Sequence, residues 1–231
     1  MSNTFTIEVT IITKSNCLIG NQTESFSVGG VDQSTTVDEN GRPIIHGSAF
    51  KGSFRNIIRE NDDNINYMKY TKDYLRQALD SITKKYEGIP DEKKTEKIKN
   101  MIEKIEGYKS DMKAEYIFGI EGINNMPRLF FSDFRVTDNT KEINSYFNIE
   151  TKNSLEEKNG NIESRPRTYR VVKPNIDFKG TIRFNDTYFK GKKVNLSEIK
   201  NELENELKKF NKGFYGIGNS KSRGYGKIEV K

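Results

Sequence analysis

The order of its periodic segments constrains the fold of this chain more than any other feature. Alternating apolar residues indicate strands, and an apolar residue every three or four positions indicates an amphipathic helix. We expect strands at 5–13, 126–136, 176–184 and 225–231, and helices at 48–59 and 196–210. The segments therefore follow one another as strand, helix, strand, strand, helix, strand.

This order predicts an α+β fold with a ferredoxin-like (RRM-like) βαββαβ core, in which two helices lie on one face of an antiparallel sheet. Hydrophobic residues make up 33% of the 231 residues and charged residues 31%, which suffices for one core. We therefore predict a single domain with its core at about 1–59, 114–146 and 174–231.

Two polar segments are expected to lie outside this core. The segment at about 60–113 is interpreted as an inserted helical hairpin, because apolar residues recur at helical spacing in each of its halves. We expect it to be solvated decoration. The segment at about 147–173 is interpreted as an extended β-hairpin with its turn at Lys158-Asn-Gly-Asn161.

A glycine-rich stretch near the end of the chain suits phosphate binding. Glycine lets the backbone approach a ligand closely, and successive N–H groups in such a loop form an anion-binding nest. The stretch contains Gly216, Gly218, Asn219, Ser220, Lys221, Ser222, Arg223, Gly224 and Gly226. A strand follows it rather than a helix, and no G-x-x-x-x-G-K-[ST] motif is present, which argues against a nucleotide-binding enzyme.

A second anion site is expected at the start of the helix at 48–59. Ser48 is a suitable N-cap, and Lys51 and Arg55 lie four residues apart on one face. Gly52 costs about 1 kcal/mol of helix stability relative to alanine, so we expect something to compensate for it, such as the close approach of another backbone.

The totals favour a polyanionic partner and exclude several chemistries. There are 39 Lys and Arg against 33 Asp and Glu, a net charge of +6, which indicates a basic patch rather than a basic coat. Cys17 and His46 are the only residues of their types, so neither an internal disulfide nor a histidine pair can form, and a zinc site would need several carboxylates as ligands. The apolar runs are too short to span a bilayer and no signal peptide is evident, so we expect a cytoplasmic protein.

Three segments, in this order, resemble the RAMP superfamily of CRISPR proteins: 47–55, 129–134 and 216–226. The similarity is closer to the backbone subunit of type III effector complexes. That subunit has a G-[GA]-[IV]-D motif, an acidic turn and a G-S-x-x-K-G helix start, which match Gly29-Gly-Val-Asp32, the turn at 38–43, and Gly47 onward. His46, Phe50 and the long insertion depart from the family pattern.

The resemblance implies partners and roles for individual residues. The partners would be a guide RNA, a complementary target RNA, further copies of the chain in a filament and other type III subunits. Ser48, Lys51 and Arg55 would hold the guide backbone, together with Gly216, Gly218, Asn219, Ser220, Lys221 and Arg223. Arg165 and Arg167 would bind RNA from a thumb-like hairpin.

The resemblance also implies a metal-dependent endoribonuclease that acts within the assembled complex. Asp32 would be the catalytic residue, as general base or as ligand of a divalent metal, Mg²⁺ or Mn²⁺. Two alternatives stay open. The chain could be a non-catalytic, structural guide-binding subunit, or it could be a CRISPR repeat-processing endoribonuclease, a class that usually relies on histidine.

Overall fold

The computed structural model describes residues 4–20, 31–62, 68–124, 126–138, 140–158, 160–185 and 196–231. Its chain divides into two compact units. The first comprises Met1–Ile7, Phe54–Phe130 and Ile182–Leu207. The second comprises Glu8–Ser53, Phe131–Thr181 and Lys208–Lys231. The single-domain boundaries given above stay a prediction.

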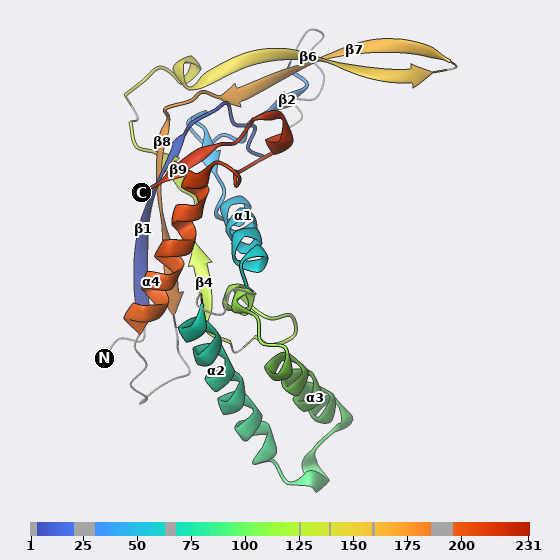
Figure 1. The fold of residues 1–231 in the computed structure, drawn as a ribbon, viewed down its shortest axis with the longest axis vertical. Helices are drawn as coiled ribbons and strands as arrows, with labels where there is room; N and C mark the ends of the chain where they lie inside the picture. The colour runs from blue at the N-terminus through green and yellow to red at the C-terminus, as the bar shows by residue number, and fades with distance from the viewer. Residues whose placement is uncertain are drawn as a thin grey trace. The chain divides into compact units, whose positions relative to one another are not determined.

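The elements drawn in Figure 1 are strands, α-helices and short 3₁₀ turns. In chain order they are β1 (Thr4–Thr13), β2 (Gln33–Ser34), β3 (Ile44–Ile45), α1 (Gly47–Glu60), α2 (Lys69–Glu87), η1 (Asp91–Lys93), α3 (Glu96–Ser110), η2 (Ala114–Phe118), β4 (Arg128–Phe131), β5 (Phe134–Val136), η3 (Ile143–Tyr146), β6 (Phe147–Lys158), β7 (Asn161–Val172), β8 (Asp177–Asn185), α4 (Leu196–Leu207), η4 (Lys208–Lys212), η5 (Lys221–Arg223) and β9 (Ile228–Val230).

The larger sheet has the strand order β3-β5-β8-β1-β9, and β4 also pairs with β8. The pairs β1–β9, β3–β5 and β5–β8 are antiparallel, with Ile11 opposite Val230 and Arg135 opposite Lys179. Along β1 every second residue from Ile7 onward is buried, as the alternation in the sequence predicts. The fold is therefore mixed α+β.

The strand expected at 126–136 is interrupted, which corrects the prediction. It forms β4 and β5, separated by Ser132 and Asp133. The Ser132 hydroxyl accepts a hydrogen bond from the Thr181 N–H at 2.8 Å, in the place where a regular ladder would use a carbonyl. The last strand is also shorter than expected, because Tyr225 and Gly226 belong to the preceding loop.

The core of the second unit is built around Phe50 of α1. Its ring centroid lies 4.7 Å from that of Phe134 on β5 and 5.3 Å from that of Phe210 in η4. A Cβ on Gly180 of β8 would lie 2.6 Å from the Phe134 ring, so this glycine makes room for the aromatic cluster. These contacts join the start of α1, the sheet and the C-terminal segment.

The first unit has its own aromatic core and buries most of one face of α2. Phe184 stacks on Phe5 and meets Tyr74 of α2 edge-on. Glu202 of α4 accepts hydrogen bonds from the hydroxyl and the N–H of Thr71, at 2.7 and 3.2 Å, and so caps the start of α2. The prediction of a helical hairpin is confirmed, but α2 is part of a core and not solvated decoration.

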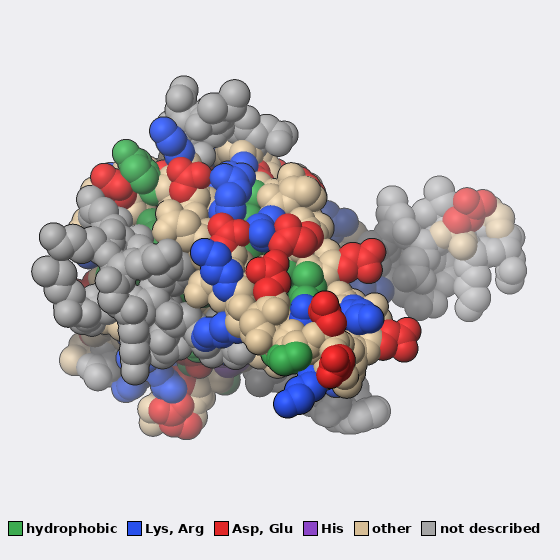
Figure 2. Space-filling view, turned by 90° about the horizontal axis from the view of Figure 1, so that it is seen from below, with side chains coloured by type: hydrophobic (Ala, Val, Ile, Leu, Met, Phe, Trp, Pro, Cys, Tyr) green, Lys and Arg blue, Asp and Glu red, His purple; other side chains and the backbone are tan. Residues whose placement is uncertain are grey.

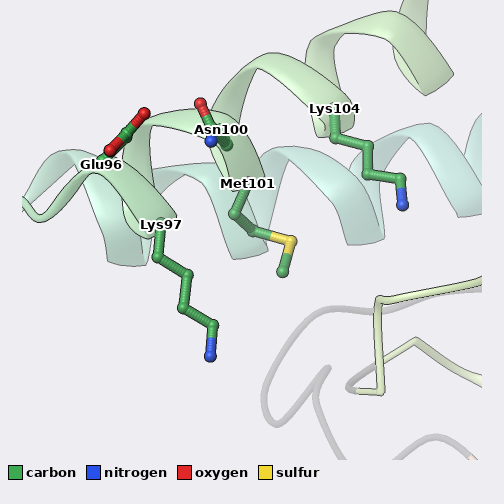
Figure 3. Close-up of a pocket in the computed structure, with 5 residues that line it drawn as sticks. All are labelled: Glu96, Lys97, Asn100, Met101 and Lys104. Carbon is green, nitrogen blue, oxygen red and sulfur yellow. The ribbon is translucent and has the colours of Figure 1, made fainter.

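The second helix of the insertion, α3, buries only Ile105. A shallow hollow of about 410 Å³ lies along it, lined by Glu96, Lys97, Asn100, Met101 and Lys104. Figure 3 shows these five side chains on the helix. All five of these side chains come from one helix, so the hollow lacks the convergent groups of a ligand site. None of the described helices is both long enough and apolar enough to cross a membrane.

The extended hairpin expected at 147–173 is confirmed. Strands β6 and β7 pair without a break from Phe147 opposite Val172 to Lys158 opposite Asn161. Figure 1 shows them as a long two-stranded ribbon. Gly160 takes the positive φ of +77° at the turn, and β2 runs parallel to β7 near the other end of the ribbon.

Candidate nucleic-acid interface

The start of α1 is capped by a side chain from another part of the second unit. The Gly47 N–H donates to Asp133 Oδ1 at 2.9 Å, so Asp133, and not Ser48, caps this helix. A Cβ on Gly47 would lie 2.7 Å from the carbonyl oxygens of Phe131 and Ser132. The close approach expected at Gly52 therefore occurs at Gly47, which corrects two predictions.

Gly52 instead opens the surface of α1. A Cβ at this position would meet nothing within 4 Å. Ser48 and Gly52 are exposed and Lys51 is half-buried, and residues three and four apart share one helix face. Because Asp133 occupies the helix terminus, an anion would have to approach along this face rather than at the cap. His46 lies beside the same carboxylate, with Nδ1 3.5 Å from Asp133 Oδ1.

Three glycines of the glycine-rich loop are required by close packing. A Cβ on Gly216 would lie 2.5 Å from the Gly226 carbonyl oxygen, and one on Gly226 would lie 2.0 Å from the Ile217 carbonyl oxygen. Gly218 has a φ of +75°, and its Cβ would lie 2.2 Å from the Leu18 carbonyl oxygen. These glycines hold the loop together and against the segment that follows β1.

Fewer N–H groups of the glycine-rich loop are available to an anion than the sequence suggests. The N–H groups of Ile217, Asn219 and Gly226 donate to backbone carbonyls of the same unit at 2.8–2.9 Å. Within the described part of the chain, the N–H groups of Ser220, Lys221 and Ser222 donate to no acceptor. The side chains of Lys221, Ser222 and Arg223 are exposed at the same tip. The loop thus offers an anion a short turn, 220–223, with open N–H groups and two cations.

Asp32 is exposed and tied to the hairpin. Its N–H donates to the Thr168 carbonyl at 2.9 Å, and its Oδ2 accepts a hydrogen bond from the Thr168 N–H. The next two residues form β2 alongside β7. The position of Asp32 is therefore set by the hairpin. Gly29 and Gly30 of the same motif lie outside the described residues.

The hairpin and the glycine-rich loop are joined by contacts that the sequence does not predict. Glu150 of β6 accepts hydrogen bonds from the Tyr225 hydroxyl and from Asn16 Nδ2. Lys152 places its Nζ 3.6 Å from the centroid of the Tyr225 ring. The alternation of β6 puts Glu150 and Lys152 on one face, but nothing local indicates their partners.

Among the expected RNA-binding arginines, Arg55 has a partner in the first unit. Glu115 Oε2 accepts from Arg55 Nε at 2.9 Å and from Arg59 Nε at 3.1 Å. Partial burial raises the pKa of Glu115, but the hydrogen bonds and charges of the two arginines lower it by a larger amount. Its pKa therefore lies below the usual value. Arg167 is exposed, and the side chain of Arg165 lies outside the described residues.

The structure brings Lys51, the glycine-rich loop and Asp32 into the second unit, whereas Arg55 belongs to the first. Figure 2 shows one face on which positive and negative side chains are interspersed. The net positive charge is therefore not displayed as a uniform field on that face.

Comparison with known proteins places the chain in a family. The sequence profile of the RAMP superfamily matches residues 10–229, and the chain belongs to this superfamily. No curated protein matches its sequence.

Solved structures resemble its fold. One is a chain of the complex described as "Cryo-EM structure of the Type III-B Cmr-beta bound to cognate target RNA", with a TM-score of 0.55 and 19% identity. The match covers 99% of this chain and 59% of that one, so this chain spans less than two thirds of its neighbour's length. A second is "Type III-B Cmr-beta Cryo-EM structure of the Apo state", at a TM-score of 0.48 and 12% identity, covering 98% of this chain and 96% of the other.

Proposed function

We propose that this chain is an RNA-binding backbone subunit of a type III CRISPR effector complex, and that it holds a guide RNA in a filament of copies. The observation that carries the proposal is the turn at 220–223, where open N–H groups and the exposed Lys221 and Arg223 meet. Such a site binds phosphates irrespective of base. Membership in the RAMP superfamily and the fold of a type III-B neighbour support the same reading.

We further propose that the core is ferredoxin-like. In support, the strands β5, β8, β1 and β9 are neighbours in the sheet in this order. Together with helices α1 and α4 they follow one another along the chain as β1, α1, β5, β8, α4 and β9. A βαββαβ core leaves the loops at its edge free to bind a nucleic acid backbone.

For catalysis we propose that Asp32 promotes cleavage of target RNA. RNA carries its own nucleophile, the 2′-hydroxyl, so the protein must align it and accept its proton. Asp32 has one carboxylate oxygen bound to the Thr168 N–H, which fixes the direction of the other. In this role the hairpin orients the carboxylate, while the cations of the loop hold phosphates.

A divalent metal fits the site at Asp32 only if RNA and water supply most of its ligands. In the described part of the chain, no three metal-binding side chains gather into one group. Asp32 would supply one oxygen to Mg²⁺ or Mn²⁺, ions that retain several waters and prefer oxygen ligands. When bound, such an ion would offset charge that develops on the phosphate.

The second candidate function is a structural subunit in which Asp32 only anchors its loop to β7. The double hydrogen bond between Asp32 and Thr168 favours this alternative, because a purely structural aspartate would make the same bonds.

The test compares Asp32→Ala with Asp32→Asn in the assembled complex on complementary RNA. Asparagine keeps a side-chain oxygen for the Thr168 N–H but removes the negative charge. Catalysis predicts that both variants bind target RNA normally and leave it uncut. If Asp32→Asn cuts as the wild type does, Asp32 is an anchor and the catalytic role is wrong.

A further inference from the structure

Phe214 is far more exposed than any other large apolar side chain in the described part of the chain. The exposed fraction of the Phe214 side chain is 91%, whereas those of the other exposed large apolar side chains lie between 43% and 69%. A single exposed apolar residue is common on protein surfaces and needs no explanation by itself. The position of Phe214, immediately before the glycine-rich loop, gives it a context that the other exposed residues lack.

The backbone around Phe214 is fixed on both sides. Before it, Asn211 makes two hydrogen bonds with Val230 of β9, at 3.0 and 2.7 Å, and Phe210 is fully buried. After it, Ile217 is fully buried and its N–H donates to Gly226 at 2.9 Å. The ring is therefore held outward on an anchored turn, and ordering it for a ligand costs little entropy.

The stretch of sequence that carries Phe214 contains cations and no carboxylates of its own. Between Leu207 and Ile228 the chain contains six Lys or Arg residues and neither Asp nor Glu. Lys212, Lys221 and Arg223 are exposed, and none of them forms an ion pair within the described residues. An exposed aromatic ring among unpaired cations is the combination by which proteins bind single-stranded nucleic acids.

We propose that Phe214 is a base-stacking residue that holds one nucleobase of the RNA whose phosphates lie at the 220–223 turn. The inference rests on the proposed RNA binding and adds a nucleobase contact to it. A self-complementary contact with a second copy of the chain is less favoured, because two identical cationic segments would then face and repel each other.

The test uses the absence of tryptophan from the native sequence. Phe214→Trp introduces a single tryptophan at the proposed stacking position, and its emission is excited separately from that of the tyrosines. Tyr70→Trp on α2 is a control at an exposed residue of the first unit. Each variant is titrated with labelled single-stranded oligo(A) RNA and with inorganic polyphosphate, which carries charge but no bases. Anisotropy of the RNA label reports binding independently of the tryptophan emission.

The proposal predicts that oligo(A) quenches the emission of Phe214→Trp but not that of Tyr70→Trp, and that polyphosphate quenches neither. It also predicts that Phe214→Ala and Phe214→Leu each weaken RNA binding by about tenfold, since leucine is apolar but has no π-face. RNA that binds without quenching, or full affinity in Phe214→Leu, overturns the stacking role and leaves the phosphate site standing.

Two other outcomes separate the remaining cases. If anisotropy shows no RNA binding by any variant, the proposed function fails and this inference fails with it. If the emission of Phe214→Trp shifts with protein concentration in the absence of RNA, the ring contacts a second copy and the stacking assignment is wrong.

Discussion

The Tyr225 hydroxyl of the glycine-rich loop donates a hydrogen bond to the Glu150 carboxylate of the hairpin, across 75 residues of sequence. Asn16 donates to the same carboxylate, and Lys152 lies over the Tyr225 ring. The residue that follows Glu150, Thr151, pairs with Thr168, whose N–H binds Asp32. One continuous set of contacts therefore links the proposed phosphate-binding loop to the proposed catalytic residue.

Replacing Tyr225 by phenylalanine removes this hydrogen bond and keeps the ring under Lys152. We expect a loss of about 1 kcal/mol in the free energy of unfolding, the usual value for one hydrogen bond. Tyr169→Phe is the matched control, because the Tyr169 hydroxyl makes no hydrogen bond within the described part of the chain. Urea denaturation measures both. Equal stability of the two variants would show that the junction does not hold the loop.

The cap on α1 predicts that Asp133 and Ser48 differ in importance. Asp133→Ala should cost about 1 kcal/mol in the free energy of unfolding, since it removes the acceptor for the Gly47 N–H. Asp133→Asn should restore most of that loss, because an amide oxygen can also cap a helix. Ser48→Ala should have little effect. A larger loss for Ser48→Ala than for Asp133→Ala in urea denaturation would contradict the structure.

The two glycines of α1 should respond to alanine in opposite directions. Gly47→Ala brings a methyl group within 2.7 Å of two backbone carbonyl oxygens and should destabilise the fold strongly. Gly52→Ala places its methyl group in open space and should raise the free energy of unfolding by about 1 kcal/mol. Thermal unfolding of both variants is the measurement. Tolerance of Gly47→Ala would mean that this packing is wrong.

Glu115 should contribute stability that depends on pH. Its folded-state pKa lies below its ordinary value of 4.5, because Arg55 and Arg59 favour the charged form more than burial disfavours it. A depressed pKa stabilises the fold at pH values above 4.5, and this contribution is lost as the pH falls through the folded-state pKa. In Glu115→Gln, stability should therefore fall less steeply between neutral and acidic pH than in the wild type. An equally flattened profile in Glu121→Gln, which removes a carboxylate at an exposed position, would contradict this account.

Local periodicity was enough to predict β1, the helices near both ends of the core and the hairpin with its turn. Each of these depends on residues close together in sequence. The cap from Asp133 to Gly47 spans 86 residues, and no local signal indicates it. The burial of α2 likewise depends on Phe184 and Glu202, which come much later in the chain.

The candidate site follows the same division. The resemblance to the family pointed to Lys221, Arg223 and Asp32, all of which the structure leaves exposed. It could not show that Glu115 binds Arg55. Glu115 lies just after the insertion at about 60–113, which has no counterpart in the family pattern. Nor could glycine spacing reveal that Gly216, Gly218 and Gly226 serve packing while the turn at 220–223 stays open.

The salt dependence of RNA binding tests the central claim, phosphate binding by the 220–223 turn, most directly. The slope of log affinity against log salt is negative. The double variant Lys221→Ala/Arg223→Ala should reduce its magnitude by about 1.4, since each cation at a single-stranded phosphate contributes about 0.7. Lys97→Ala/Lys104→Ala on α3 loses the same net charge and should keep the wild-type slope. An unchanged slope in the loop variant, or equal slopes in the two variants, would contradict the account.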